Sequence, residues 1–444
     1  MNKKILIIGA GPCGLGAAYR LQELGHSNWK IYEANPCVGG LSRSMKDDKG
    51  FIWDIGGHVI FSHYPYFDAL FEKLLSGQYA AHTRSCWIRI MSSFVPYPFQ
   101  NNLNFLPPDI TVECLLGLIK AQNQEQAPSN FKEWTSMTFG EGISKYFMHP
   151  YNSKVWAHPL EEMSFSWVAE RVSAVDLKKI LESVVKNTKD TQWGPNNQFK
   201  FPLHGGTGGL FEKIVPFIKD HLFLNKEAVS INTAKKEISF SDGSKERYDA
   251  LISTMPLNEF IRCSDLHGLE EAADSLRYSS VLAVGVGLKG ETPSDKTWLY
   301  FPESDCPFYR VTYFSNYSPN NAPEGCWSLL TEVSHSEYKH EDKGTIVEKV
   351  IEGLKNTGLI TSKMEIVDTY VFDAKHAYPT PTLGRDAALA AIQSKLMELD
   401  IYSRGRFGAW MYETGNMDHS VMQGVEAVNK ILLGADETVW RLKQ

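Results

Sequence analysis

The first fourteen residues place the strongest constraint on how this chain folds. Four apolar residues, 5–8, lead into glycines at positions 9, 11 and 14, and helical sequence follows as far as Leu24. Gly9 permits a tight turn from strand to helix, Gly11 lets the backbone approach a pyrophosphate, and Gly14 lets the helix pack on the strand. We therefore predict a βαβ unit whose helix N-terminus binds a dinucleotide through unpaired N–H groups.

An acidic residue follows at the distance that this interpretation requires. Residues 30–33 form a second predicted strand, which ends at Glu33, 19 residues after Gly14. A carboxylate in that place accepts hydrogen bonds from a ribose diol. The alternative is a glycine-rich turn in an ordinary βαβ unit.

A second glycine pair, Gly39 and Gly40, lies shortly after this acid, and Ser42 follows it. Glycines at this point let the backbone pass close to the pyrophosphate or the ring system of a dinucleotide. We predict that these three residues contact the cofactor, with an ordinary turn as the alternative.

Composition excludes several other classes of protein. A chain of 444 residues exceeds one ordinary core, so we expect two or three domains. The net charge of −7, from 45 basic and 52 acidic side chains, argues against a partner that is nucleic acid or an acidic membrane. We find no secretory signal and no apolar stretch that would span a bilayer.

Cysteine usage and motif content narrow the chemistry further. The seven cysteines are scattered and form no CxxC motif, which indicates free thiols in a cytoplasmic protein and predicts no metal site. The chain contains no GxSxG, HExxH or P-loop motif, so the sequence gives no support to a hydrolase or a kinase.

The pattern along the chain predicts an α/β fold with a discontinuous Rossmann-like dinucleotide-binding domain, a helical insertion domain and an antiparallel β-sheet substrate domain. The predicted boundaries are residues 1–80, 197–265 and 385–444 for the first, 81–196 for the mainly helical domain, and 266–384 for the sheet domain. Within them we expect helices at 112–121, 131–147, 168–185 and 345–354, a strand at 407–410, and a terminal helix from about 418.

The segment 56–63, Gly-Gly-His-Val-Ile-Phe-Ser-His, carries the next chemical pattern. Its two glycines allow the backbone to lie against a flat ring, and we predict that Gly57 contacts the cofactor. His58, directly after the glycines, is either a functional donor or a satisfied polar group. His63 is better explained as a satisfied polar group.

Several cationic and aromatic residues fit an anionic ligand. Arg171, Arg310 and Arg406 each lie among aromatic residues, and a planar guanidinium suits a diphosphate, although surface ion pairs are the alternative. Tyr378 and Tyr412 can each donate a phenolic hydrogen to a phosphate.

Trp298 and Tyr300 alternate with Leu299, so they project from one face of a predicted strand, where they either stack on a sugar or pack in the core. Residues 415–420 precede a helix, as at the second helix N-terminus that FAD proteins of this architecture place beside the cofactor.

Taken together, these blocks resemble the UDP-galactopyranose mutases, and in particular their eukaryotic-type branch. They follow one another in the family's order through nearly the whole chain. The resembling stretches are residues 56–63, 95–102, 147–156, 170–172, 193–196, 205–209, 298–301, 308–319, 378–383 and 403–426.

The resemblance implies a flavin-dependent isomerase that interconverts UDP-galactopyranose and UDP-galactofuranose. The cofactor is then FAD, active when reduced, whose N5 attacks the anomeric carbon of the sugar, with no net redox change. The resemblance also implies NADPH or NADH as a transient reductant. Open alternatives are an FAD-dependent oxidase or desaturase of the amine-oxidase type, a mutase for another nucleotide sugar, and a non-catalytic nucleotide-sugar or FAD-binding protein.

By the same resemblance, the catalytic residues are Arg171 and Arg310, which grip the diphosphate, and His58, which presents its backbone to the flavin. The implied substrate-binding residues are Tyr97, Gln100, Met148, Asn152, Arg171, Asn196, Trp298, Tyr300, Arg310, Tyr378 and Tyr412. The predicted cofactor-binding residues are Gly9, Gly11, Gly14, Glu33, Gly39, Gly40, Ser42, Gly57, Val229, Asn416, Met417 and Ser420.

Two positions depart from the family pattern. His149 and Met411 stand where the resemblance leads us to expect arginines, which would change contacts to the sugar or the phosphates. The chain stops soon after its terminal helix, where some relatives carry an extension used in assembly, so we expect a monomer or a homodimer.

Overall fold

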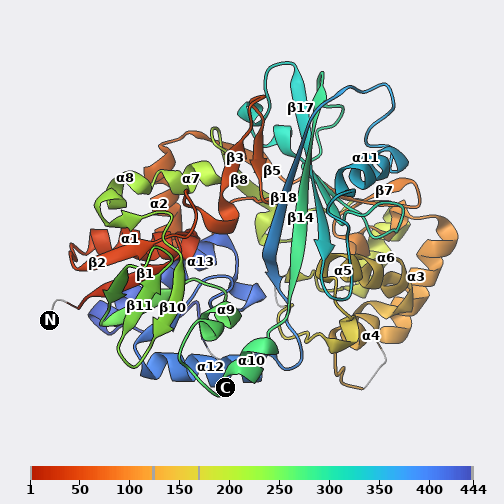
Figure 1. Ribbon diagram of the computed structural model, residues 1–444. Coiled ribbons are helices and arrows are strands. Elements are labelled where there is room, and N and C mark those ends of the chain that lie inside the picture. The colour runs from red at the N-terminus through yellow and green to blue at the C-terminus, as the bar shows by residue number, and fades with distance from the viewer. Residues whose placement is uncertain (1–2, 123–125, 169–170, 442–444) are drawn as a thin grey trace.

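The computed structural model describes residues 3–122, 126–168 and 171–441. Two lobes lie side by side, one built on a five-stranded parallel sheet and the other on a seven-stranded mixed sheet whose long strands rise between them (Figure 1). The mixed α/β class predicted from the sequence is confirmed. No helix among the described residues is long and apolar enough to cross a bilayer.

The parallel sheet has the strand order β19-β13-β1-β2-β9, and every neighbouring pair in it is parallel. Its central strand is buried on both faces, because helices cover it from both sides. The strands are β1 (Ile5–Ile8), β2 (Trp29–Tyr32), β9 (Leu222–Phe223), β13 (Ala250–Ser253) and β19 (Ile401–Ser403).

Two groups of helices form the layers on this sheet. The face that carries Ile5 and Ile7 packs against α1 (Pro12–Glu23), α2 (Pro65–Leu75), α7 (Gly208–Glu212), α8 (Val215–Ile218) and α13 (Met417–Leu433). The face that carries Leu6 and Ile8 packs against α9 (Leu257–Arg262), α10 (Glu270–Asp274) and α12 (Arg385–Glu398).

Helices α1 and α13 cross at glycines. A Cβ atom on Gly16 would lie 2.5 Å from the carbonyl oxygen of Val421, and one on Gly424 would overlap the carbonyl oxygen of Cys13. The two backbones therefore touch, which places the N-termini of both helices at one side of the sheet.

Three small sheets complete this side of the molecule. Gly243, with φ of +83°, makes the turn between β11 and β12, which pair as an antiparallel hairpin. The strands are β10 (Ala228–Asn232), β11 (Glu237–Phe240) and β12 (Lys245–Arg247), the pair β3 (Ser44–Lys46) and β4 (Ile52–Asp54), and the pair β5 (Tyr79–Thr83) and β8 (Gln198–Pro202).

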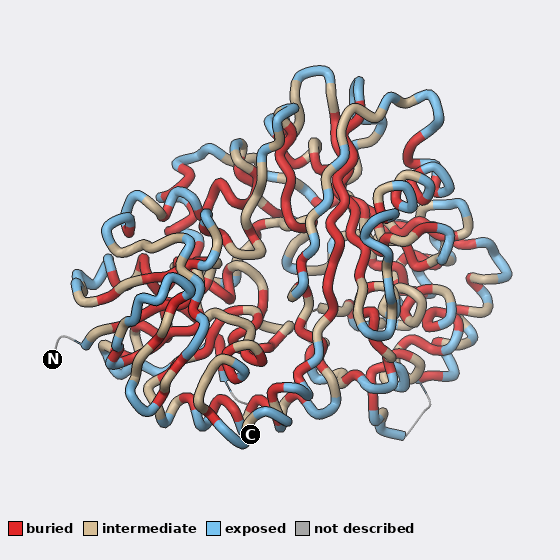
Figure 2. The backbone as a smooth tube through the Cα atoms, viewed as in Figure 1, coloured by how far each residue is buried: buried red, intermediate tan, exposed pale blue. Residues whose placement is uncertain are grey.

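The mixed sheet has the order β18-β14-β17-β16-β15-β6-β7. The prediction of an antiparallel platform holds for every pair except β15 and β6, which run parallel. Its strands are β6 (Cys86–Ile90), β7 (Ser93–Pro96), β14 (Tyr278–Lys289), β15 (Trp298–Tyr300), β16 (Arg310–Tyr313), β17 (Cys326–His335) and β18 (Ile366–Pro379). The long central strands are almost wholly buried (Figure 2).

Each face of this sheet has its own cover. Leu282, Val284 and Val286 share one face with α11 (Ile346–Asn356), as their alternation predicts. On the other face, Gly285 and Gly287 lack side chains, and the rings of Trp53 and Phe51 occupy that space. Strand β4 thereby packs directly on β14 and joins the two lobes.

The helical region lies beside the mixed sheet and consists of α3 (Pro108–Ala121), α4 (Phe131–Ile143), α5 (His149–Trp156) and α6 (Leu177–Lys186). The predicted helix at 168–185 is wrong at its start. Residues 172–176 are not helical, and the side chain of Asp176 caps α6 by accepting from Lys179 N. Region 81–196, predicted to be mainly helical, also supplies β6 and β7.

A second prediction fails near the C-terminus. Residues 407–410 form a turn, and the last strand of the parallel sheet is β19, earlier in the chain. Gly405 has φ of +84° and Trp410 has φ of +55°, so the backbone bends on both sides of this segment. Its apolar residues are buried in the core that lies below the sheet, which explains why the segment looked like a strand.

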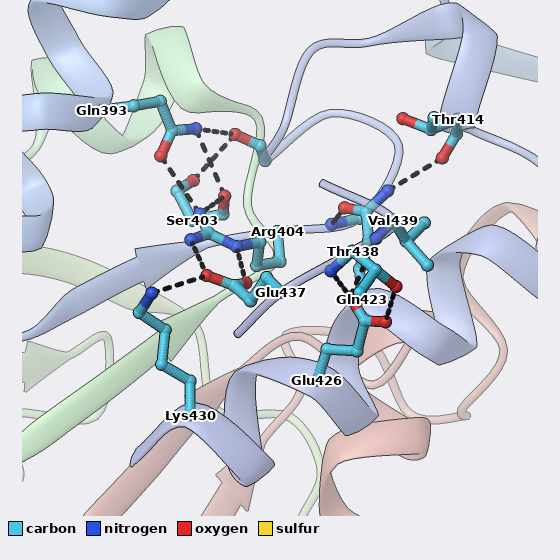
Figure 3. Close-up of polar contacts among 12 residues, drawn as sticks. Gln393, Ser403, Arg404, Thr414, Gln423, Glu426, Lys430, Glu437, Thr438 and Val439 are labelled. Carbon is cyan, nitrogen blue, oxygen red and sulfur yellow. Dashed lines mark hydrogen bonds and ion pairs between the residues drawn. The ribbon is translucent and has the colours of Figure 1, made fainter. Parts of the chain in front are cut away.

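The chain ends in a segment tied down by charge (Figure 3). Arg404 is fully buried and donates from Nε and Nη2 to the two carboxylate oxygens of Glu437, at 2.5 and 2.8 Å. Its guanidinium carbon also lies 3.5 Å from the centre of the Trp440 ring. Glu426 of α13 accepts from the backbone N–H groups of Thr438 and Val439. The terminal segment therefore closes over the parallel-sheet lobe.

Candidate functional site

One cavity of about 780 Å³ runs from the N-terminus of α1 to the helical region. Its lining comes from the parallel-sheet lobe, from the ends of β15, β16, β17 and β18, and from α5. A single space therefore connects the predicted dinucleotide site with the predicted substrate site.

At one end of the cavity, Gly11 and Gly40 form a site without side chains, which we call the glycine cradle. Gly11 precedes α1, and a Cβ atom added to it would meet only the Cα of Gly40, at 3.7 Å. A Cβ atom on Gly40 would lie 3.0 Å from the Cα of Gly11. Two bare backbones thus face one another at a helix N-terminus, which fits the pyrophosphate of a dinucleotide.

Glu33 lies at the end of β2, where the ribose was predicted. It is buried, and its Oε2 accepts from the backbone N–H of Ala10 at 2.7 Å, while Oε1 accepts from the backbone and side-chain nitrogens of Asn35. These bonds fix the carboxylate in the cavity wall, so it is oriented for a ribose diol before any ligand arrives.

Most of the predicted cofactor residues line the cavity together, namely Gly9, Gly11, Glu33, Gly40, Ser42, Gly57, Asn416, Met417 and Ser420. Gly14 lies behind the lining, where a Cβ atom would overlap the carbonyl oxygen of Gly9. Gly39 donates its N–H to Ala10 and shapes the turn from outside the lining. Val229 is also outside it, with a side chain 46% exposed, and its neighbour Ala228 lines the cavity instead.

The loop that begins at Gly56 faces the centre of the cavity. Gly57 donates its N–H to Glu332 Oε1 at 2.9 Å, and a Cβ atom on Gly57 would overlap Thr312 Oγ1. His58 Nδ1 is buried and finds no hydrogen-bond partner within the residues that the structure describes. Burial lowers the pKa of His58 to about 4, so its imidazole is neutral at neutral pH.

A buried carboxyl group supports this loop from behind. Asp54 is wholly buried, and its Oδ2 accepts from Thr207 Oγ1 at 2.6 Å and lies 4.0 Å from His58 Nδ1. Burial raises the pKa of Asp54 to about 7, although the hydroxyl groups of Ser44 and Thr207 oppose that shift.

At the far end of the loop, His63, Asp418 and His419 form a compact group. The two carboxylate oxygens of Asp418 are divided between the imidazoles, 2.7 Å from Nδ1 of His63 and 3.1 Å from Nδ1 of His419. Hydrogen bonding explains the arrangement, which fastens the loop to the start of α13. His63 is thus the satisfied polar group that its sequence context favoured.

Arg310 projects from β16 into the same cavity and is held by a carboxylate. Its Nε and Nη2 each lie 2.5 Å from Glu332 Oε1, and Tyr309 donates to Glu332 Oε2 at 2.6 Å. Glu332 is 2% exposed and lines the cavity, yet sequence reasoning did not identify it. It lies within the apolar strand β17, where spacing alone does not separate a buried anchor from a core position.

Arg171 lines the same cavity, next to the residues that precede α13. Its Nη1 donates to Asn416 Oδ1 at 2.9 Å and its Nη2 donates to the carbonyl of Glu413 at 2.8 Å. The guanidinium lies 5.1 Å above the ring of Tyr412. Glu170, part of one stretch that carried the resemblance, lies outside the described residues.

Arg406, named with Arg171 and Arg310 as a candidate for the diphosphate but left out of the substrate-binding residues that the resemblance implied, also lies in the lining. It donates to the carbonyls of Ala377 and Gly415 and lies 5.0 Å from the centre of the Tyr378 ring. Burial raises the pKa of Tyr378, and the carboxylate of Glu332 raises it further. Its hydroxyl therefore keeps its proton and can donate to an anion.

The remaining predicted substrate residues gather at the end of the cavity next to α5, and all but one of them line it. Trp298 is the exception, because it is 4% exposed and packs in the core against Phe199. It shares a face of β15 with Tyr300, as predicted, and only Tyr300 reaches the cavity. The others in the lining are Tyr97, Gln100, Met148, Asn152, Asn196, Tyr378 and Tyr412.

Comparison with known proteins identifies the family to which this fold and this cavity belong. A family model for flavin containing amine oxidoreductases matches residues 12–441. A solved structure of reduced UDP-galactopyranose mutase superimposes with a TM-score of 0.97 and 45% identity, covering 99% of this chain and 96% of that chain. The chain belongs to the flavin-containing amine oxidoreductases and, among them, to the UDP-galactopyranose mutases. The resemblance stated from the sequence is confirmed, and the cofactor is FAD.

More distant relatives share part of the chain. Protoporphyrinogen oxidase 2 of Arabidopsis thaliana is 38% identical, over 58% of this chain and 58% of its own length. The 4,4'-diaponeurosporene oxygenase of Staphylococcus aureus strain MRSA252 is 32% identical, over 29% of this chain and 22% of its own. The chain spans less than two thirds of the length of either relative.

Two positions where the mutase family pattern predicts arginines lie outside the cavity lining. His149 contacts Thr135 Oγ1 at 2.9 Å, and burial lowers its pKa. Met411 is 6% exposed and packs in the core under the parallel sheet. Tyr151 lines the cavity and was not predicted, with its ring 5.0 Å from that of Tyr300.

Proposed function

We propose that this protein is a UDP-galactopyranose mutase that interconverts UDP-galactopyranose and UDP-galactofuranose. The observation that carries the proposal is the single cavity whose lining includes both the glycine cradle and two arginines, Arg171 and Arg310. A nucleotide sugar held between these arginines would have its sugar at the centre of the cavity, next to the loop at Gly57.

FAD, when bound and reduced, supplies a nucleophilic nitrogen that can attack the anomeric carbon of the sugar. The protein's part begins with the cradle. Gly11 and Gly40 leave room for the pyrophosphate, and Glu33 holds the ribose. Gly57 would meet the flavin ring with the rest of its backbone, because its N–H is already bonded to Glu332.

The substrate must keep its leaving group nearby, because a lost nucleotide ends the reaction. Arg310 is suited to this task, since Glu332 fixes its guanidinium before the substrate binds. Arg171 closes the other side, and the hydroxyl groups of Tyr378 and Tyr412 donate to the same diphosphate. Charge-assisted bonds of this kind contribute about 1.5–3 kcal/mol each.

Neutral His58 fits a positioning role better than one in proton transfer. Its pKa of about 4 means that it does not change charge near neutral pH. The imidazole therefore fills the wall behind the flavin-facing backbone, as the resemblance implies.

Further properties belong to the same proposal. The family blocks support the eukaryotic-type branch and transient reduction by NADPH or NADH, and the scattered cysteines support a cytoplasmic location. A monomer or homodimer is proposed as the assembly. The three-domain division at residues 80, 196, 265 and 384 is likewise proposed, with β6 and β7 assigned to the sheet of residues 266–384.

The test incubates UDP-galactofuranose with dithionite-reduced enzyme and, in parallel, with oxidised enzyme. Chromatography then measures the product that each reaction forms. The proposal predicts UDP-galactopyranose from the reduced enzyme only. Oxygen uptake with an amine, and no dependence on prior reduction, would instead support an oxidase of the wider amine oxidoreductase family.

A further inference from the structure

A turn at residues 412–416 forms part of the cavity wall and carries Tyr412. It joins the buried segment before it to α13. The carbonyls of Tyr412, Glu413 and Gly415 accept hydrogen bonds from the cavity-lining residues Arg171 and Arg406. We call it the 412–416 turn.

The inner side of this turn receives Arg171. Asn416 Oδ1 and the carbonyl of Glu413 accept from the guanidinium at 2.9 and 2.8 Å, and the ring of Tyr412 lies beneath it. The position of Arg171 is therefore defined by the position of the turn.

The outer side of the turn is held by another arginine. Arg385, the first residue of α12, donates from Nη1 and Nη2 to the two carboxylate oxygens of Glu413, both at 2.8 Å. Arg385 is 1% exposed, and it does not line the cavity. Gln423 of α13 adds one bond to the carbonyl of Thr414 at 2.8 Å (Figure 3).

Two guanidinium groups therefore grip one residue from opposite sides, Arg385 through the side chain of Glu413 and Arg171 through its carbonyl. Bidentate arginine–carboxylate pairs restrict orientation as well as distance. Removing Arg385 leaves the carboxylate of Glu413 without this partner, and the turn would shift to hydrate it. Removing the charge of Glu413 still leaves Arg385 paired with Asp386, whose Oδ1 lies 2.8 Å from Nε.

We propose that Arg385 is a positioning residue for nucleotide binding, which acts through Glu413 to hold Tyr412 and Arg171 at the diphosphate. This inference rests on the proposed function, because it takes a nucleoside diphosphate as the ligand between the arginines. It adds a residue outside the cavity, 28 positions before its partner in the chain.

The experiment measures the dissociation constant of UDP for the flavin-loaded enzyme by calorimetry. Arg385→Met should raise that constant about tenfold, which is the size of coupling expected within one ion-pair network. Flavin content and the visible spectrum should stay unchanged, and KM should rise more than kcat falls. Arg385→Lys should recover part of the affinity, because it restores the charge without the bidentate geometry.

Arg404→Met is the matched control. Arg404 is equally buried and makes an equally bidentate pair, but neither it nor its partner Glu437 in the terminal segment lines the cavity. This variant should lose about as much thermal stability as Arg385→Met, and its dissociation constant for UDP should lie within twofold of the wild-type value. An equal loss of UDP affinity in Arg404→Met would overturn the positioning role.

Glu413→Gln provides a second route if Arg385→Met does not fold. It should weaken UDP binding severalfold, and the Arg385→Lys change should add little in its presence. Wild-type affinity for UDP in either Arg385→Met or Glu413→Gln would overturn this inference and leave the proposed function standing. A wild-type enzyme that binds no UDP would overturn the proposed function as well.

Discussion

Glu332 Oε1 lies 2.5 Å from Arg310 Nε and, on its other side, accepts the backbone N–H of Gly57 at 2.9 Å. One buried carboxylate thus anchors both the cation assigned to the diphosphate and the loop assigned to the flavin. A substitution of Glu332 should consequently affect the binding of both the diphosphate and the flavin.

Arg310→Ala should weaken UDP binding by about 1.5–3 kcal/mol, because it removes a charge-assisted contact. Glu332→Gln keeps the shape of the side chain but loses its charge, so it should weaken UDP binding and also alter the flavin spectrum. Calorimetry and absorbance measure the two effects. Tyr309→Phe is the control, since it removes a neutral donor to Glu332 and leaves the ion pair in place. UDP affinity unaffected by Arg310→Ala would count against the clamp.

Gly11→Ala should separate folding from cofactor binding. Its backbone has φ of −75°, and the added methyl group would meet only Gly40 Cα at 3.7 Å, so the flavin-free protein should keep its melting temperature. The same methyl group occupies space that the pyrophosphate needs, so FAD affinity should fall at least about tenfold. Gly14→Ala is the contrasting variant, because its methyl group overlaps a backbone oxygen and should cost about 1–3 kcal/mol of stability. Retention of FAD by Gly11→Ala would contradict the cradle.

Gly57→Ala should be destabilised by about 1–3 kcal/mol, since its methyl group would overlap the buried Thr312 Oγ1. Thr312→Ala should rescue part of this loss when combined with it. Removing the hydroxyl of Thr312 takes away the atom that the added methyl group would overlap. Thermal melts of the four proteins in this cycle measure the coupling. Strictly additive effects would show that the two residues do not collide.

Asp54 predicts a pH dependence of stability. Its pKa in the folded protein is raised to about 7, whereas an exposed aspartate titrates near 4. Between those values the folded state holds a proton that the unfolded chain has released, so the free energy of unfolding falls as pH rises from about 4 to about 7. Asp54→Asn should remove this contribution of up to about 4 kcal/mol. The free energy of unfolding of the variant should therefore increase relative to that of wild type as pH rises. Urea midpoints at several pH values test this, and parallel curves for the two proteins would rule it out.

The sequence allowed the cofactor end of the site to be predicted because its determinants are local. Gly9, Gly11 and Gly14 lie in one turn, and Glu33 ends the next strand, so short-range geometry decides their roles. Similarly, the start of α13 follows from the glycine and polar residues before it.

The failures share a physical cause, which is dependence on contacts between distant segments. Trp298 and Tyr300 alternate correctly, but only packing against Phe199 decides that Trp298 is buried and Tyr300 reaches the cavity. Glu332 and Arg385 act through partners that fold onto them from elsewhere in the chain. The segment 407–410 has the composition of a strand, and the positive φ angles around it make it a turn.

The central claim is that the enzyme uses a reduced flavin without spending its electrons. The most direct measurement is an anaerobic reaction in which a counted, single equivalent of reductant is supplied per FAD and UDP-galactofuranose is in large excess. The account predicts many molecules of UDP-galactopyranose per electron pair, with the flavin still reduced at the end. One product per electron pair, or flavin that reoxidises as product forms, would contradict it.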